Sequence, residues 1–158
     1  MAGEQPGVGE IWIARADRVP DTYVLVVEVH DGHVQALMCG DECELATNTD
    51  SILEPRVTSC LRRLLVHGDL AATILDERLV QLMGSVPPEL AQRVVLRGRG
   101  LDFHSTDLGR GTPIVDDTDP RWEWKLEKLR QLRRLRASAA ELGWKMYQLG
   151  DPAAERTA

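Results

Sequence analysis

The chain has 158 residues, of which 43% are hydrophobic and 28% charged, a size and composition that fit one globular domain with an appendage. No stretch approaches the roughly 20 apolar residues of a membrane helix, and the first residues lack the basic and apolar segments of a signal peptide. The three cysteines are odd in number and unclustered, so we expect free thiols and a cytoplasmic location.

Charge is distributed unevenly along the chain. The net charge is −6, but residues 121–136 contain seven basic and two acidic residues, a balance of +5. The remaining residues therefore carry −11. This contrast between a basic segment and an acidic body is the clearest charge asymmetry in the sequence.

The first predicted strand covers residues 9–15 and follows a flexible leader at 1–8. Ile11 and Ile13 would lie on one face of this strand and Trp12 on the other, because side chains alternate along a strand. Residues 17–21 contain a proline and are predicted to form a loop.

Residues 23–39 predict a β-hairpin around which the fold is organised. Asp31 and Gly32 suit a two-residue type I′ turn, in which both central residues have φ > 0. One face of the hairpin would be apolar throughout and the other polar near the turn, a pattern typical of a curled sheet or small barrel. The opposed apolar pairs would be Val29–Val34, Val27–Ala36 and Leu25–Met38.

The segment between the hairpin and the first helix gives shorter signals. In order, it contains a candidate strand (43–47), a turn (48–51), an extended piece (52–54), a helix or strand (57–66), a break (67–69) and two strands (70–75 and 78–83). Pro87 and Pro88 then open a predicted helix that runs to Leu96, since proline is tolerated in the first turn.

The last part of the chain predicts a linker and a long helix. Residues 97–119 contain four glycines and no periodicity, so they read as a Gly-rich linker. Asp119 and Pro120 signal the start of a basic amphipathic helix over 120–149, followed by a flexible tail at 150–158. A coiled-coil seam with spacing 3-4-3-4-3 predicts a homodimer contact through Leu132, Leu135, Ala139, Leu142, Met146 and Leu149.

The order of these motifs resembles the MazF/PemK family of toxin ribonucleases. The resemblance covers about residues 9–96 and is carried by the Gly-Glu-Ile-Trp segment at 9–12, the strand at 24–27 and the turn into a helix at 82–90. It implies a mainly β fold, namely a small SH3-like antiparallel barrel, here with one short and one long C-terminal helix. It also implies a metal-independent endoribonuclease of a toxin–antitoxin system, with an antitoxin as protein partner.

The positions that carry catalysis in this family are not matched. Residues 21–23 are Asp-Thr-Tyr where the family has an Arg-Pro pair, and residues 38–40 are Met-Cys-Gly where it has a hydroxyl residue. By position, Arg15, Arg18 and Thr22 are the substitutes that would stabilise a phosphate undergoing attack. We therefore predict a non-catalytic or degenerate interaction module, and a sequence-specific endoribonuclease is the alternative.

No metal site or cofactor is predicted. His30, His33, Cys39 and Cys43 have suitable side chains, but His33 and Cys39 are about 20 Å apart along a strand. Zinc ligands lie about 2.0–2.3 Å from the metal, so these four cannot form one site. Cys39 is expected to be a structural thiol.

The basic helix is the main candidate for binding RNA or DNA. Lysines and arginines neutralise backbone phosphates without regard to sequence. Two other interpretations remain open: a solvated face, or a helix that packs on its own acidic barrel. The candidate residues are Lys125, Lys128, Arg130, Arg133, Arg134 and Arg136.

Overall fold

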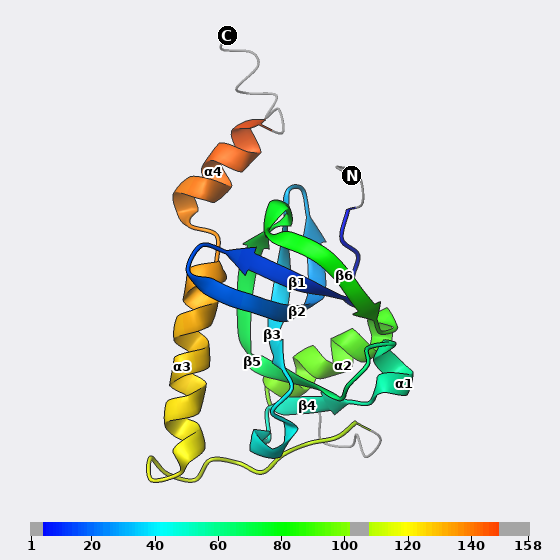
Figure 1. The fold of residues 1–158 in the computed structure, drawn as a ribbon, viewed down its shortest axis with the longest axis vertical. Helices are drawn as coiled ribbons and strands as arrows, with labels where there is room; N and C mark the ends of the chain where they lie inside the picture. The colour runs from blue at the N-terminus through cyan, green and yellow to red at the C-terminus, as the bar shows by residue number, and fades with distance from the viewer. Residues whose placement is uncertain (1–4, 102–107, 149–158) are drawn as a thin grey trace.

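The computed structural model describes residues 5–101 and 108–148. Six strands form one antiparallel sheet in the order β4-β5-β3-β2-β1-β6, and the sheet is strongly bent (Figure 1). The strands are β1 (Glu10–Ala16), β2 (Val19–His30), β3 (His33–Gly40), β4 (Asp50–Leu53), β5 (Leu64–Leu75) and β6 (Leu79–Ser85). The helices are α1 (Pro55–Thr58), α2 (Pro88–Gly98), α3 (Pro120–Leu135) and α4 (Ala139–Gln148), with 3₁₀ turns η1 (Cys43–Leu45) and η2 (Asp76–Arg78).

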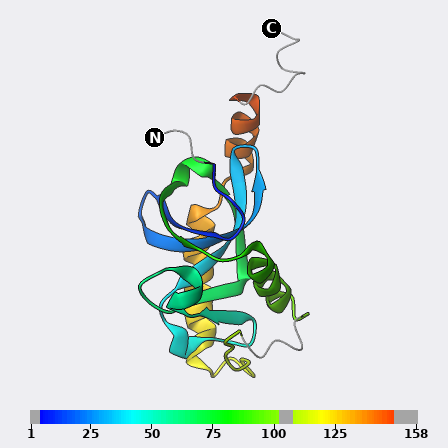
Figure 2. The same cartoon turned by 90° about the vertical axis from the view of Figure 1, so that its right-hand side faces the viewer.

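Each face of the sheet has its own apolar core, because side chains alternate along every strand. The core under α3 includes Val24, Val26 and Ile74, together with Leu132 and Leu135 of α3 itself. The core under α2 is built from these buried residues: Ile11, Leu25, Leu37, Leu53, Leu64, Val66, Val86, Ala91 and Val94. Figure 2 shows α2 and α3 on different sides of the barrel.

The hairpin forms where the sequence predicts it, but its turn type and part of its register differ. Gly32 has φ 79°, whereas Asp31 does not have a positive φ, so a type I′ turn is wrong. Near the turn Val29 pairs with Val34, as expected, and a bulge at Val27 then shifts the register by one residue. Beyond the bulge the observed pairs are Val26–Ala36, Leu25–Leu37 and Val24–Met38.

The bulge decides which residues share a face. Because a one-residue slip exchanges the two faces of a strand, Leu25 and Met38 lie in different cores instead of facing each other. Beyond the bulge, on the side away from the turn, the hairpin therefore has apolar side chains on both faces.

Two segments predicted to interrupt strands, at 17–21 and 67–69, lie largely within strands. β2 begins at Val19, so the loop expected at 17–21 is reduced to a turn at Asp17 and Arg18. β5 runs through the break expected at 67–69, and Gly68 has a packing role there. A Cβ on Gly98 would lie 2.0 Å from the carbonyl oxygen of Gly68, so the paired glycines allow α2 to approach β5.

The segment from 43 to 58 also differs from expectation. Residues 43–45 form the 3₁₀ turn η1 instead of a strand. A turn forms at 48–49 as expected, and the strand β4 takes up the rest of the expected turn and most of the extended piece. Of the segment expected as helix or strand at 57–66, only 57 and 58 belong to a helix, α1, whereas 64–66 begin the strand β5. The helix predicted to open at Pro87 and Pro88 is confirmed as α2.

The long C-terminal helix is two helices. α3 ends at Leu135 because Arg136 has an extended backbone, and the N–H of Ala137 donates to the carbonyl of Thr73 on β5. Ser138 and Glu141 then form a reciprocal capping box that starts α4, with bonds of 3.0 and 3.1 Å. The Ser-x-x-Glu spacing was the sequence signal for this break.

This break corrects the predicted dimer seam. Leu132 and Leu135 are 2% and 0% exposed within the core of their own barrel, and Ala139 lies beyond the break on another helix. Leu142 is half-buried on α4. The seam therefore does not form one continuous stripe, and the side chain of Met146 and all of Leu149 lie outside the described residues.

The described residues of the segment at 97–119, expected to be a Gly-rich linker, include part of α2 and contacts with β4. Arg97 belongs to α2, is 1% exposed and donates from its guanidinium to the carbonyls of Leu108 and Gly109, at 2.9 and 2.7 Å. Gly109 also bridges to Ile52 of β4. At the other end of the chain Pro6 is buried, within the segment expected to be a flexible leader.

Within the described ranges, no helix is both long and apolar enough to cross a membrane.

Candidate functional site

The three residues expected to act on a phosphate do not converge. Arg15 is exposed and forms a two-bond ion pair with Asp21, at 2.9 and 2.8 Å. This guanidinium hydrogen bond lowers the pKa of Asp21. Arg18 lies in the exposed turn before β2, with φ 63°.

Thr22 is the one candidate of the three that lines a groove. Its side chain is 4% exposed, and its hydroxyl donates to the carbonyl of Pro20 at 2.8 Å. The same oxygen accepts from the amide of Gln131 on α3, also at 2.8 Å. The hydroxyl of Thr22 therefore already donates one hydrogen bond and accepts one within the protein.

The groove beside Thr22 has a volume of about 690 Å³ and lies between the barrel and α3. We call it the β3 groove. Its floor is apolar, and its rim holds charges of both signs: Asp21, Asp41, Glu42, Arg62, Arg63 and Lys128. Neither Arg15 nor Arg18 lines it.

The rim charges of the β3 groove are already paired. Lys128 lies 3.3 Å from Glu42, Arg62 4.0 Å from Asp41, and Arg63 3.3 Å from Glu54. The Arg62 and Asp41 side chains are 84% and 67% exposed, so this pair is weak and open to exchange. The groove is charge-balanced and has no surplus of positive charge for a polyphosphate.

Thiols also border this groove, but the one on its floor is unreactive. Cys39 and Cys60 both line it. Cys39 is buried, and burial raises the pKa of its thiol. A high pKa disfavours the thiolate that acts as nucleophile, so Cys39 has the character of a structural thiol.

The basic residues of α3 divide into an inner and an outer set. Lys125 and Lys128 point toward the barrel and bind carboxylates there, and Arg121 donates to the carbonyls of Ala46 and Thr112 at 2.8 and 2.9 Å. The outer set is exposed, and Arg130 pairs with Glu127 of its own helix at 2.9 Å. Among the described residues, no ion pair engages the other outer side chains, Arg133, Arg134 and Arg136.

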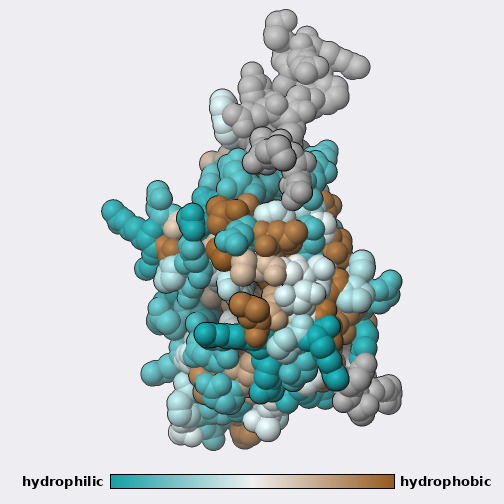
Figure 3. Space-filling view, turned by 45° about the vertical axis from the view of Figure 1, so that its right-hand side comes forward, coloured by the Kyte–Doolittle hydropathy of each residue, from teal (hydrophilic) through white to brown (hydrophobic). Residues whose placement is uncertain are grey.

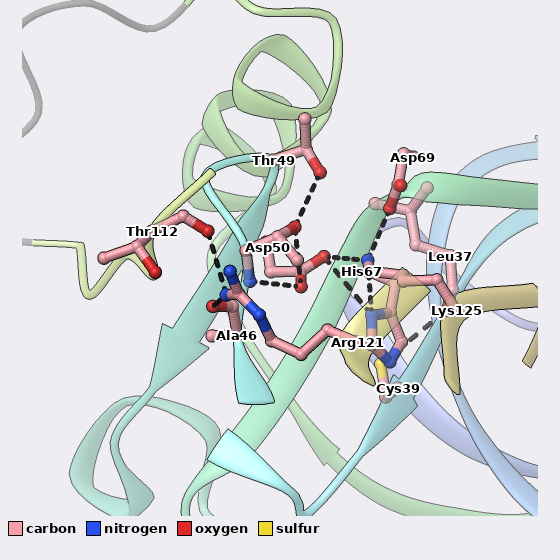
Figure 4. Close-up of polar contacts among 11 residues, drawn as sticks. Leu37, Cys39, Ala46, Thr49, Asp50, His67, Asp69, Thr112, Arg121 and Lys125 are labelled. Atoms are coloured by element: carbon pink, nitrogen blue, oxygen red, sulfur yellow. Dashed lines mark hydrogen bonds and ion pairs between the residues drawn. The ribbon is translucent and has the colours of Figure 1, made fainter. Parts of the chain in front are cut away.

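A buried polar network fastens α3 to the sheet (Figure 4). The ammonium of Lys125 lies 2.6 Å from Asp50, 2.8 Å from Asp69 and 2.9 Å from Nδ1 of His67. Asp50 and His67 are 0% and 1% exposed. The second carboxylate oxygen of Asp50 accepts from the N–H and hydroxyl of Thr47.

The network keeps Asp50 ionised. Burial raises the pKa of Asp50, but the hydrogen bond and charge of His67 and those of Lys125 together outweigh burial, and the net shift is downward. Nδ1 of His67 lies 3.2 Å from Asp50. With its proton on Nδ1 the imidazole donates to Asp50, whereas a proton on Nε2 would be buried without an acceptor among the described residues.

Asp50, His67 and Asp69 are the residue types that bind a divalent metal, and their ligand atoms lie within 4.8 Å of one another. The ammonium of Lys125 takes the position that a metal would need. Sequence reasoning missed this cluster because Lys125 and Asp50 are 75 residues apart and no local pattern joins them.

His30 and His33, at the turn of the hairpin, are not part of the buried network around His67. The rings of His30 and His33 stack with their centroids 4.9 Å apart, and His30 lies 2.9 Å from Glu28. They cap the exposed end of the hairpin.

Comparisons with known proteins concern the fold. The sequence matches no family model and no curated protein. Similar solved structures include an endoribonuclease in complex with its cognate antitoxin from Mycobacterial species, with 17% identity and a TM-score of 0.48 over 65% of this chain and 100% of that one. They also include the Mycobacterium tuberculosis toxin MazF-mt6, with 20% identity and a TM-score of 0.47 over 60% of this chain and 99% of that one.

The expected mainly β, antiparallel fold is confirmed by the six-stranded sheet of this chain itself. At this level of identity the similar structures leave the activity of the chain open. The function must therefore be argued from the geometry of its own site.

Proposed function

We propose that the chain is a homodimeric, non-catalytic interaction module built on a MazF/PemK-like barrel. The observation that carries this proposal is the state of the three candidate catalytic residues. Arg15 is bound by Asp21 outside the β3 groove, Arg18 is outside it too, and the hydroxyl of Thr22 is held by Gln131. Such a site lacks the preorganised positive charge that phosphate cleavage requires.

The ligand-binding surface in this proposal is the outer side of α3 and the turn that follows it. Arg134 and Arg136 are exposed there without ion-pair partners among the described residues, so they are available for the phosphate backbone of RNA or DNA. The net charge of −6 makes such binding weak and strongly dependent on salt. The charge-balanced β3 groove suits a protein segment, with an antitoxin-like partner as its occupant.

A test of this proposal separates binding from cleavage. Purified protein is incubated with a long RNA of mixed sequence, at low and at high salt, and the RNA is examined for fragments and for binding. We expect intact RNA, with weak binding at low salt that an Arg134→Glu, Arg136→Glu double variant reduces. Arg56→Glu, an exposed change on α1, is the control and should leave binding unchanged.

The alternative function is a metal-independent endoribonuclease, and one observation favours it. Thr22 lines the same groove as Arg62 and Arg63, so a hydroxyl and two guanidinium groups share one site. Defined RNA fragments would establish this activity and contradict the non-catalytic proposal. Loss of cleavage in Arg62→Ala, Arg63→Ala, but not in Arg15→Ala, Arg18→Ala, would then assign the phosphate to the groove.

A further inference from the structure

The buried network beneath α3 arranges three side chains of metal-binding type around one point. Asp50 begins β4, and His67 and Asp69 lie two residues apart on β5, so these two face the same side of the strand. The pairing of Asp50 with His67 across the two strands brings the three residues together, with ligand atoms within 4.8 Å of one another. We call Asp50, His67 and Asp69 the cation cluster.

The ammonium of Lys125 lies at the centre of the cation cluster (Figure 4). It is 2.6 Å from Asp50, 2.8 Å from Asp69 and 2.9 Å from Nδ1 of His67, so one positive group touches all three. Zinc lies about 2.0–2.2 Å from imidazole nitrogens and carboxylate oxygens. Each ligand atom would therefore move by less than about 1 Å to hold a metal at the same point.

The surroundings of the cation cluster have two further features of a metal site. The second carboxylate oxygen of Asp50 accepts from the N–H and the hydroxyl of Thr47, at 2.8 and 3.1 Å, which fixes the orientation of this ligand. Asp69 and Lys125 also line a second groove, of about 410 Å³, beside α3. An ion from solvent therefore has a path to the cluster, and a displaced ammonium has a path to solvent.

Nδ1 of His67 faces two neighbours with opposite requirements. Asp50, at 3.2 Å, favours a proton on this nitrogen, whereas the Lys125 ammonium, at 2.9 Å, is itself a donor and favours a lone pair there. A metal in place of the ammonium would bind the Asp50 carboxylate and the Nδ1 lone pair together. Ligation leaves the imidazole proton on Nε2, which has no acceptor among the described residues, so we expect micromolar and not nanomolar affinity.

We propose that the cation cluster binds a divalent transition metal, with Zn²⁺ as the ion that suits it best, in competition with the ammonium of Lys125. Zn²⁺ accepts imidazole nitrogen together with carboxylate oxygen, whereas Mg²⁺ and Ca²⁺ prefer oxygen ligands alone. Three protein ligands leave a fourth position for water. Metal binding releases Lys125 from the sheet and so removes one of the contacts that hold α3. This site is separate from the surfaces of the proposed function.

The first measurement is a calorimetric titration of the full chain with Zn²⁺, together with thermal unfolding at each metal concentration. We expect one ion per chain and a rise in melting temperature, because an ion that binds only the folded protein stabilises it. Lys125→Ala should bind Zn²⁺ at least about tenfold more tightly, since the binding-competent state no longer requires an ammonium to leave. Mg²⁺ should give no comparable rise in melting temperature.

Control variants separate the cation cluster from binding at the surface. Hydrophilic residues cover much of the face that Figure 3 displays, and exposed carboxylates among such residues bind metal ions weakly. Asp69→Asn should weaken Zn²⁺ binding by roughly tenfold or more. Asp41→Asn removes a carboxylate from an exposed ion pair elsewhere and should leave binding unchanged. The His30→Gln, His33→Gln double variant should also bind normally, since those stacked rings lie at the hairpin turn.

The displacement of Lys125 has a readout of its own. An amine-acylating reagent modifies accessible lysines, and mass spectrometry of the peptides locates the product. In the unmodified chain, Zn²⁺ should raise the acylation of Lys125 several-fold. Acylation of Lys128 should stay unchanged, because this lysine pairs with Glu42 and not with the cation cluster.

Every result decides part of the proposal. An unmodified chain that does not bind Zn²⁺ at millimolar concentration would overturn it, as would equal binding by Asp69→Asn and Asp41→Asn. Loss of binding in the double histidine variant would place the ion at the hairpin turn instead. Binding without increased acylation of Lys125 would contradict the competition. If Lys125→Ala does not fold, the Asp69→Asn comparison and the acylation of the unmodified chain still decide the proposal.

Discussion

Gly32 allows the tight turn between β2 and β3. Its φ of 79° lies in the left-handed region, which a β-branched side chain strongly resists. We expect Gly32→Val to lower the free energy of unfolding by about 1–2 kcal/mol. Urea unfolding measures this, and Gly32→Asn is the control, since asparagine tolerates this conformation and should cost less. A valine variant as stable as the unmodified protein would contradict a positive φ at residue 32.

Lys125 is the residue that neutralises the buried carboxylate of Asp50. Lys125→Met keeps much of the side-chain length but removes the charge, which leaves Asp50 with only uncharged donors and His67. We expect a loss of about 3 kcal/mol in the free energy of unfolding. Lys128→Met is the matched control: its partner Glu42 is 37% exposed, so it should cost less than about 1 kcal/mol. Equal losses would mean that the network adds no more than a surface pair.

Asp50 also makes stability depend on pH. Its folded pKa is lowered, so the stability it contributes is present above its unfolded pKa of about 4 and is lost as the pH falls through the folded value. We expect Asp50→Asn to be much less stable than the unmodified protein at pH 7, and the difference to shrink below pH 4. Urea unfolding across this range measures it. A difference that stays constant with pH would show that Asp50 does not titrate this way.

At the scale of elements, the capping box of Ser138 and Glu141 determines that α3 and α4 are separate helices. Ser138→Ala removes the bond to the Glu141 N–H and should destabilise α4 by about 1 kcal/mol. Hydrogen exchange should then be faster in α4 and unchanged in α3. Ser138→Thr is the control that keeps the hydroxyl. Faster exchange throughout α3 as well would indicate that the two helices unfold together.

At the scale of the whole molecule, α3 is part of the barrel core and α4 is an attachment. Leu132 and Leu135 fill one core, whereas α4 is fastened to the barrel by the Arg78–Glu141 pair at 2.7 Å. We expect a chain that ends at Asp119 to lose cooperative thermal unfolding, because it exposes that core. A chain that ends at Ser138 should retain it. A stable, cooperative protein from the shorter chain would show that the barrel does not need α3.

Local physical chemistry explains which elements the sequence predicted. The Asp31-Gly32 turn, the alternation of Ile11, Trp12 and Ile13, and the proline start of α2 depend on neighbours within a few residues. Such features are fixed by backbone preferences and by side-chain alternation, so they can be read from a sequence. The start of α3 at Asp119 belongs to the same group, since the Asp119 carboxylate accepts from the Arg121 N–H.

What only the tertiary structure decided depends on groups far apart in the chain. The bulge at Val27 lies in the pairing of β2 with β3, and Gly68 of β5 packs closely against Gly98 of α2. The role of Lys125 required Asp50 and His67, which come from two strands on the sheet. The basic residues of α3 give the same sequence pattern whether their charges face solvent, phosphate or buried carboxylates. The sequence does not specify which surface the helix covers.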